Sequence, residues 1–175
     1  MQKYLLSIIA TLISFFALSQ TTNTNDKIYK HNGEVILVKV IKVAESVITF
    51  KFPSEDVEQT IGKLAVEKIE YSSGRVESVS EKVVIDGKKD WEKVQIITDK
   101  SIVVGLRKGD EINGKTSSWL SYNTQSGADK KSTKHIKETA AEHNAPFILL
   151  TSDKEVANWS GVAQGLKKGV IYTYN

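Results

Sequence analysis

The chain has 175 residues, with 24 lysines and arginines against 21 aspartates and glutamates, and a formal net charge of +3 at pH 7. This near balance argues against a dedicated nucleic-acid-binding protein, which concentrates a large basic excess on one face. Only Arg75 and Arg107 are arginines, and bidentate phosphate recognition prefers arginine to lysine. Because the chain contains no cysteine, disulfides, thiolate metal sites and lipid attachment through a thiol are excluded.

The first residues, MQKYLLSIIATLISFFALSQ, have the layout of a secretory signal peptide. One lysine precedes an apolar run over residues 4–18, with small residues at Ala17 and Ser19. A retained membrane anchor is the alternative, but serine and threonine interrupt the run, and it is short for a hydrocarbon core of about 30 Å. We therefore expect cleavage between Ser19 and Gln20, no stable membrane anchor afterwards, and a periplasmic or secreted protein.

The residues after the polar lead of 20–25 follow a strand-and-turn pattern. DKIYKHNGEVILVKVIKV predicts a short strand, a tight turn at Asn32-Gly33 and a long strand over residues 34–43. SVITFKF alternates apolar and polar residues and predicts the next strand, which Pro53 ends.

The long strand over residues 34–43 has apolar residues at both alternate sets of positions. One set is Val35, Leu37, Ile41 and Val43, and the other is Ile36, Val38 and Val40. A strand buried on only one face would alternate more strictly. We therefore expect it to bend and to serve two faces of a small barrel or of a tightly coiled sheet.

The rest of the first half continues with an acidic loop, another strand and one helical turn. AVEKIEYSSGRVESV then predicts a short strand at residues 69–71, a turn at residues 72–74 and a closing strand from Arg75. Short strands at this spacing predict an SH3-like or Sm-like β-barrel over residues 26–85.

The charged segment DGKKD, residues 86–90, marks the expected domain boundary. WEKVQIIT and SIVVGLRKG predict two strands, and DEING predicts a turn. A loop over residues 116–127 precedes a helix through KKSTKHIKETAAEHN, with Ile136, Ala140 and Ala141 or Thr133 facing inward. APFILLTSD predicts a buried strand, KEVANWSGVAQGLKKG a loop or short helix, and VIYTYN a last strand. Residues 86–175 thus predict a small α+β domain with one main helix.

The Ser-Gln ending of the first segment, together with DKIYKHNGEVILVKVIKV and KIEYSSGRV, resembles uncharacterised exported proteins of Bacteroidota. Their recurring pattern is a strand, an Asn-Gly or Asp-Gly turn, a long valine-rich strand and a final Ile-x-Tyr-x-x-Gly segment. The resemblance covers about residues 1–80. It implies an envelope or secreted location in a Gram-negative cell, and it brings no catalytic residues with it.

No catalytic, metal or cofactor motif stands out. His135 and His143 are eight residues apart on the predicted helix, whereas zinc-binding helices prefer a spacing of four. Ser160, in NWSGVAQG, lacks the apolar strand that precedes a nucleophile elbow. We therefore assign no catalytic residue, no metal ligand and no cofactor; this pattern favours a non-catalytic protein and leaves a hydrolase as the alternative.

The sharpest functional hypothesis concerns aromatic residues in polar segments. Trp119, Tyr122 and Trp159 could form a patch, because flat rings contribute large contact areas and stack on sugars or on partner side chains. The structural alternative is that they fold inward over the core.

The sequence therefore favours an exported, non-catalytic protein that binds an envelope protein or glycan through these aromatic loops. A hydrolase acting on envelope polymers and a structural assembly subunit, which would pair through its strand edges, are the alternatives. The sequence sets neither the ligand nor the oligomeric state.

Overall fold

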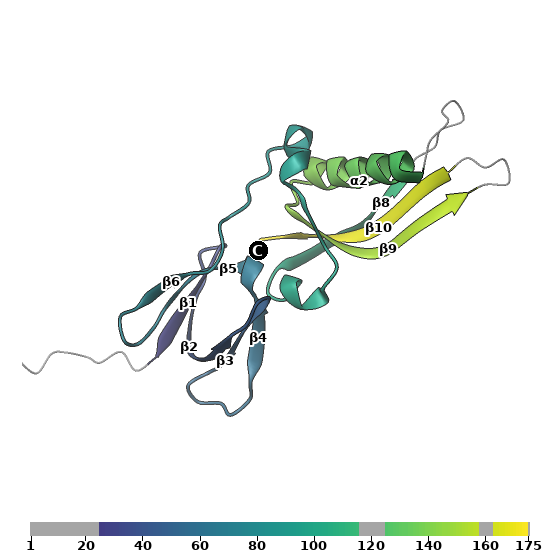
Figure 1. The fold of residues 1–175 in the computed structure, drawn as a ribbon. Helices are drawn as coiled ribbons and strands as arrows, with labels where there is room; N and C mark the ends of the chain where they lie inside the picture. The colour runs from purple at the N-terminus through teal and green to yellow at the C-terminus, as the bar shows by residue number, and fades with distance from the viewer. Residues whose placement is uncertain (1–24, 116–124, 158–162, 175) are drawn as a thin grey trace, which may run out of the picture.

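The computed structural model describes residues 25–115, 125–157 and 163–174 (Figure 1). Strands form two separate sheets, and one long helix lies against the second of them. The protein is therefore an α+β protein with one main helix, as the sequence predicts.

The first half forms a six-stranded antiparallel sheet in the order β4-β3-β2-β1-β5-β6. Its strands are β1 (Asp26–Lys30), β2 (Val35–Val43), β3 (Val47–Lys51), β4 (Gln59–Gly62), β5 (Val66–Glu70) and β6 (Val76–Ser78), with the short 3₁₀ helix η1 (Lys63–Ala65) between β4 and β5. The turn at Asn32-Gly33 connects β1 to β2, and Gly33 has the positive φ of 91° that this tight connection requires.

Within the described residues, this N-terminal sheet is open rather than closed into a barrel. Strands β4 and β6 are its two edges and do not pair with each other. The sheet does bend, since the register between β2 and β3 shifts between Val40 and Lys42. The likeness to SH3-like and Sm-like barrels stays a prediction.

Both alternate sets of β2 reach the N-terminal core, since Val43 packs on it together with Ile36 and Val40, but most of the set that contains Val43 faces solvent. Val38 is fully buried, whereas Val35, Leu37 and Ile41 are 45%, 51% and 45% exposed. The inner face packs on a core made by Ile28, Val38, Ile48, Phe50, Ile61, Ala65, Val66 and Ile69. No element of the described chain covers the outer face, which explains why its apolar residues remain in solvent.

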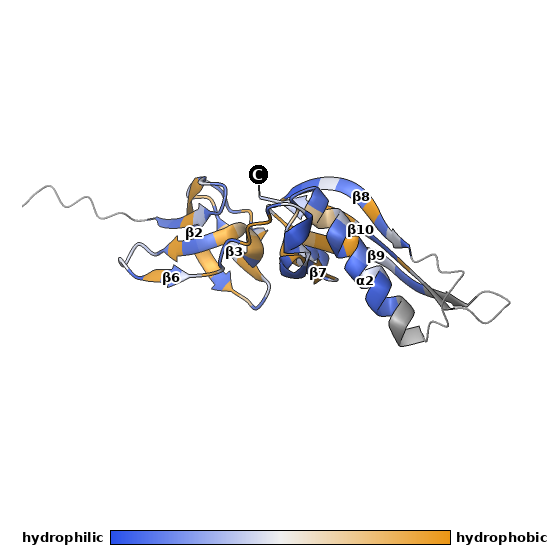
Figure 2. Cartoon of the chain, turned by 90° about the horizontal axis from the view of Figure 1, so that it is seen from above, coloured by the Kyte–Doolittle hydropathy of each residue, from blue (hydrophilic) through white to orange (hydrophobic). Residues whose placement is uncertain are grey.

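The second half forms a four-stranded sheet in the order β7-β9-β10-β8. Its elements are β7 (Gln95–Ile97), β8 (Arg107–Lys115), β9 (Phe147–Ala157), β10 (Ala163–Thr173), the helix α2 (Gln125–Glu142) and the 3₁₀ helices η2 (Lys88–Lys93) and η3 (Lys100–Val103). Strand β7 pairs in parallel with β9, and the other neighbours are antiparallel. Figures 1 and 2 show α2 lying along one face of this sheet.

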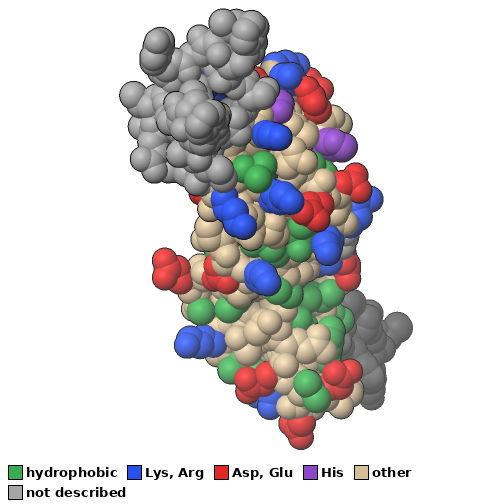
Figure 3. Space-filling model, turned by 90° about the vertical axis from the view of Figure 1, so that its right-hand side faces the viewer, with side chains coloured by type: hydrophobic (Ala, Val, Ile, Leu, Met, Phe, Trp, Pro, Cys, Tyr) green, Lys and Arg blue, Asp and Glu red, His purple; other side chains and the backbone are tan. Residues whose placement is uncertain are grey.

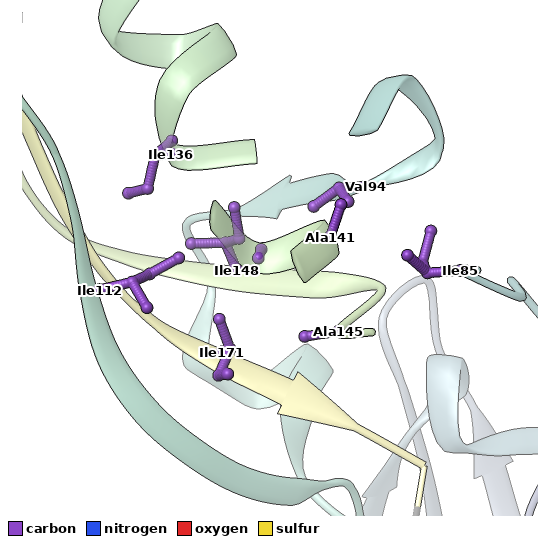
Figure 4. Close-up of a cluster of buried hydrophobic side chains, with 9 residues drawn as sticks. Ile85, Val94, Ile112, Ile136, Ala141, Ala145, Ile148 and Ile171 are labelled. Atoms are coloured by element: carbon purple, nitrogen blue, oxygen red, sulfur yellow. The ribbon is translucent and has the colours of Figure 1, made fainter. Parts of the chain in front are cut away.

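The helix packs on the sheet through the inward stripe that the sequence predicts. Ile136, Ala140 and Ala141 are fully buried, and they share a core cluster with isoleucines of the strands. Figure 4 shows the side chains of this cluster, including Ile112, Ile148 and Ile171. The helix approaches β8 closely because Gly114 has no side chain: a Cβ there would lie 2.5 Å from the backbone oxygen of Ser132.

The helix ends close to where Asn144 and Pro146 predict. Asn144 takes a left-handed conformation with φ of 53°, and the amide of Ala145 donates to the carbonyl oxygen of Ala140 over 2.9 Å. The amide of His143 donates to the same carbonyl over 3.1 Å and that of Asn144 to the carbonyl of Ala141 over 2.9 Å, so carbonyls of the last turn are satisfied where the helix ends.

Three local predictions in the second half are wrong. SIVV is the 3₁₀ helix η3, because the Asp99 carboxylate accepts a 2.8 Å bond from the amide of Ser101 and caps the turn. DEING lies inside β8, where its polar residues are exposed on an edge strand. The described residues of KEVANWSGVAQGLKKG belong to β9 and β10, not to a loop or helix.

The two halves contact each other through a third apolar cluster. Phe147 and Leu149 of β9 pack with Ile97 and Val103, and Leu64 from η1 in the first half joins them. The amide of Gly62 also donates to the carbonyl oxygen of Val104 over 2.9 Å. The division at residue 86 stays a prediction, and Leu64 and Leu106 each join an apolar cluster on the other side of it.

Charges of both signs are mixed on the molecular surface. Figure 3 shows acidic and basic side chains interspersed over one side of the molecule, with apolar side chains reaching the surface between them. This mixture agrees with the near balance of 24 basic and 21 acidic residues. A local excess of one sign must therefore come from the way that strands and helices bring particular residues together.

Candidate binding surface

The aromatic residues predicted to bind a partner, Trp119, Tyr122 and Trp159, lie outside the described residues. The strands that lead to them end close together, since Leu166 pairs with Lys115 at the end of β8, and Ala163 pairs with Ala157 at the end of β9. Both segments are therefore attached at the same end of the C-terminal sheet.

The C-terminal sheet has α2 on one face, and the opposite face is called the open face. Directly paired residues in antiparallel strands share a face, so the register of β8, β9 and β10 defines its rows. The rows are Lys154-Leu166-Lys115, Ser152-Lys168-Asn113, Leu149-Val170-Glu111 and Phe147-Tyr172-Lys108. From Leu166 to Tyr172 these rows extend about 20 Å along β10. Phe147 and Leu149, in the two inner rows, are buried in the apolar cluster shared with the first half, so the face is open to solvent only outside that contact.

Lysine is the dominant charged residue of the open face. Lys108, Lys115, Lys154 and Lys168 are exposed on it, Lys100 of η3 stands at its margin, and Glu111 is the one acid in the rows. Among the described residues, none of these five lysines has an acidic group within ion-pair distance. In the part of the chain that the structure describes, this surface therefore carries an excess of positive charge.

A groove of about 420 Å³ lies at the inner end of the open face. Its lining mixes apolar and polar groups and includes two lysines: the lining residues are Lys100, Val103, Val104, Gly105, Leu106, Lys108, Leu149, Thr151, Val170 and Tyr172. Apolar walls with a few polar groups are typical of ligand sites. An elongated, acidic and partly apolar partner fits this combination of shape and charge.

On the opposite face of the same strands, Lys167 is buried and paired with carboxylates. Lys167 is 5% exposed, and its Nζ lies 2.7 Å from Asp129 Oδ1 of α2 and 2.6 Å from Asp153 Oδ2 of β9. Burial opposes its charge, but the bonds to both carboxylates outweigh burial and raise the pKa of Lys167. Lys167 is thus a charged tie between helix and sheet, and its ammonium is already satisfied.

A second polar cluster lies at the junction of the two halves. His31, in the β1–β2 turn, is 7% exposed and stands edge-on to the ring of Tyr174, with 5.0 Å between ring centroids. Tyr174 accepts a 3.0 Å bond from the amide of Val83, and Lys82 Nζ donates to the carbonyl oxygen of His31 over 3.0 Å. These bonds tie the end of the chain to the first half.

His31 and Ser80 are in contact, but they do not form a pair of catalytic base and nucleophile. Ser80 Oγ lies 2.8 Å from the carbonyl oxygen of Val66 and 3.1 Å from that of Lys63, so its single proton is donated to a carbonyl. His31 Nε2, 2.9 Å away, must then donate to Ser80 Oγ. A catalytic serine instead donates its proton to the histidine, so this cluster is structural.

We expect the burial of His31 to make the protein less stable in mild acid. Burial lowers the pKa of His31 in the folded protein; Glu67 opposes this effect and Lys82 adds to it. Below the ordinary histidine pKa of about 6.5, the unfolded chain therefore binds a proton that the folded chain does not bind. The free energy of unfolding should fall by up to about 1.4 kcal/mol per pH unit until the folded-state pKa is reached.

Urea unfolding of the parent and of His31→Gln at several pH values between 7.5 and 5 measures this effect. The exposed His135 and His143 are common to both proteins, so the difference between the two pH profiles isolates His31. Parallel profiles would contradict the prediction.

Two features that would point to other functions are absent from the described residues. Within residues 25–115, 125–157 and 163–174, no group of three or more histidine and acidic side chains is placed to hold a metal ion. In the same part of the chain, no helix combines the length and apolar character that crossing a bilayer requires.

No protein-family model, no curated protein and no solved structure matches this chain. Sequence reasoning missed the open face because it placed DEING in a turn and KEVANWSGVAQGLKKG in a loop or short helix. Those assignments hid the fact that Lys115, Lys154 and Lys168 lie on the same face of three neighbouring strands. The strongest signal that could have found the face is the alternation of polar residues at Glu111, Asn113 and Lys115 with Ile112 and Gly114.

Proposed function

We propose that this protein is an exported, non-catalytic binding protein that holds an acidic protein or glycan partner of the cell envelope on its C-terminal half. The observation that supports this most directly is the open face, with five exposed lysines, one glutamate and a partly apolar groove. Lysine ammonium groups attract carboxylates and phosphates, and the apolar walls add contact area. The signal-like first segment supports the location.

The shape of the open face favours a macromolecule over a small ligand. Its lysines are spread along about 20 Å of strand, and a chain with repeated negative charges would contact several of them at once. The predicted aromatic residues Trp119, Tyr122 and Trp159 belong to the segments attached at the outer end of the same sheet. They would extend the binding surface beyond the lysines.

Affinity capture from an envelope fraction tests this function with three variants of the chain. Lys154→Gln with Lys168→Gln removes two charges from the open face, and Trp119→Ala with Tyr122→Ala removes the predicted aromatic contacts. Lys39→Gln with Lys42→Gln is the charge-matched control, because both lysines are exposed on the N-terminal sheet. Circular dichroism checks that each variant is folded.

We expect the parent and the control to retain the same partner, with retention by the Lys154/Lys168 variant reduced about tenfold or more. Weaker retention in 0.5 M salt would agree with charge-dependent binding. Polyglutamate and polygalacturonate, added as competitors, distinguish a protein from a glycan partner. Equal retention by the parent and the open-face variant would contradict the proposal.

A further inference from the structure

A second groove lies on the helix side of the C-terminal sheet, away from the open face. It is formed where Trp91 of η2 meets α2 and has a volume of about 430 Å³, within the range of small-ligand sites. Its lining residues are Trp91, Asp129, Lys130, Thr133, Lys134 and Lys137. The packing of the helix on the sheet explains why Ile136 and Ala140 are apolar and buried. It does not explain the groove.

The indole of Trp91 is the apolar wall of the groove. Trp91 is half-buried and packs against the core cluster under α2, and this packing fixes its position. Lys134 Nζ stands 5.2 Å from the ring centroid, so a ring face already receives a cation, and a sugar that stacks there would displace this ammonium toward its own carboxylate. A held, partly exposed indole is a flat surface on which a sugar ring can stack.

The charged groups of the groove are mainly basic. Among the described residues, Lys130 and Lys137 have no ion pair, and Lys134 has only Glu138 at 3.9 Å. Asp129 is the one acid in the lining, and its Oδ1 is 2.7 Å from Lys167. The groove therefore combines three ammonium groups with an apolar ring and with two hydrogen-bonding side chains, those of Thr133 and Asp129.

We propose that this groove binds a saccharide that carries a carboxylate. The pyranose ring stacks on Trp91, the carboxylate bonds to Lys134 and Lys137, and sugar hydroxyls donate to Asp129 or Thr133. A purely anionic ligand such as a phosphate would meet the Asp129 carboxylate, whereas a ligand with both hydroxyl donors and a carboxylate matches every group in the lining. This site is distinct from the open face and does not depend on the proposed function.

Titration of the full chain with trigalacturonic acid tests the site. The methyl ester of the acid, which has no carboxylate charge, is the comparison ligand. The signal followed is the indole N–H resonance that Trp91→Phe removes from the NMR spectrum. We expect the acid to shift this resonance and the ester to bind at least tenfold more weakly. Lys134→Gln with Lys137→Gln should weaken binding of the acid about tenfold or more.

Lys93→Gln is the matched control, because Lys93 lies in η2 beside the groove but not in its lining, and it should bind as the parent does. Several outcomes would overturn the proposal: no shift of the Trp91 resonance with the acid, equal affinity for acid and ester, or binding unchanged in the Lys134/Lys137 variant. Tighter binding of a nucleotide or of an aspartate-rich peptide than of the acid would also overturn it. Because Lys154 and Lys168 are outside this groove, failure here leaves the open-face proposal standing.

Discussion

Phe147→Ala should lower the free energy of unfolding by about 3–5 kcal/mol. Phe147 is fully buried and is the first residue of β9, where it packs with Ile97 and Leu149 in the cluster shared by the two halves. Its ring meets that of Tyr174 edge-on, with 5.5 Å between centroids. Truncation removes these contacts and leaves a cavity that the surrounding strands cannot close completely.

Urea denaturation of the parent and the variant measures the loss in free energy of unfolding, and the two proteins should have the same m-value. Val84→Ala is the control, because Val84 is 64% exposed and its truncation should change stability by less than about 0.5 kcal/mol. A loss below about 1 kcal/mol for Phe147→Ala would mean that the cluster is not packed as described.

Gly62→Ala should destabilise the protein by about 3 kcal/mol or more, at the upper end of the cost of overpacking. The conformation of Gly62, φ −69° and ψ 140°, is open to any residue, so the cost is not conformational. A Cβ would lie 2.0 Å from the carbonyl oxygen of Ile102 and 2.6 Å from its carbon. Both are backbone atoms, which cannot turn away as a side chain would, so β4 and η3 would have to separate.

Gly74→Ala provides the comparison, since Gly74 has φ of 86° but no atom within 4 Å of the place that a Cβ would occupy. It should cost about 1–2 kcal/mol, from left-handed backbone strain alone. Thermal or urea unfolding of both variants separates the two mechanisms. If Gly62→Ala were the milder change, the close contact between the two halves at β4 and η3 would be wrong.

The strands of the first half could be predicted because their determinants are local. Asn32-Gly33 sets the first tight connection, Pro53 follows β3, and the Ser72-Ser73-Gly74 turn precedes β6. Which face of β2 is buried could not be predicted, because Val35 and Leu37 are as apolar as Ile36 and Val38. Burial depends on what packs against each face, and this is decided by elements far away in the chain.

The second half was harder to predict for a related reason. Strand β8 contains DEING, whose composition is that of a turn, yet it extends to Lys115 because β10 pairs with it along most of its length. The open face arises from this pairing: Lys115 and Lys154 are far apart in sequence and lie in one row only because both pair with Leu166. No local pattern contains that information.

By itself, the sequence determined the α+β class, the N-terminal strands and the helix with its inward stripe of Ile136, Ala140 and Ala141, because turn residues and hydrophobic periodicity act over a few neighbouring positions. Tertiary structure alone decided which face of β2 is exposed, that η3 lies against β4, that separate lysines converge on the open face, and that Trp91 lies beside the lysines of α2. These features depend on strand register and on packing between distant segments, which become defined only when the chain folds.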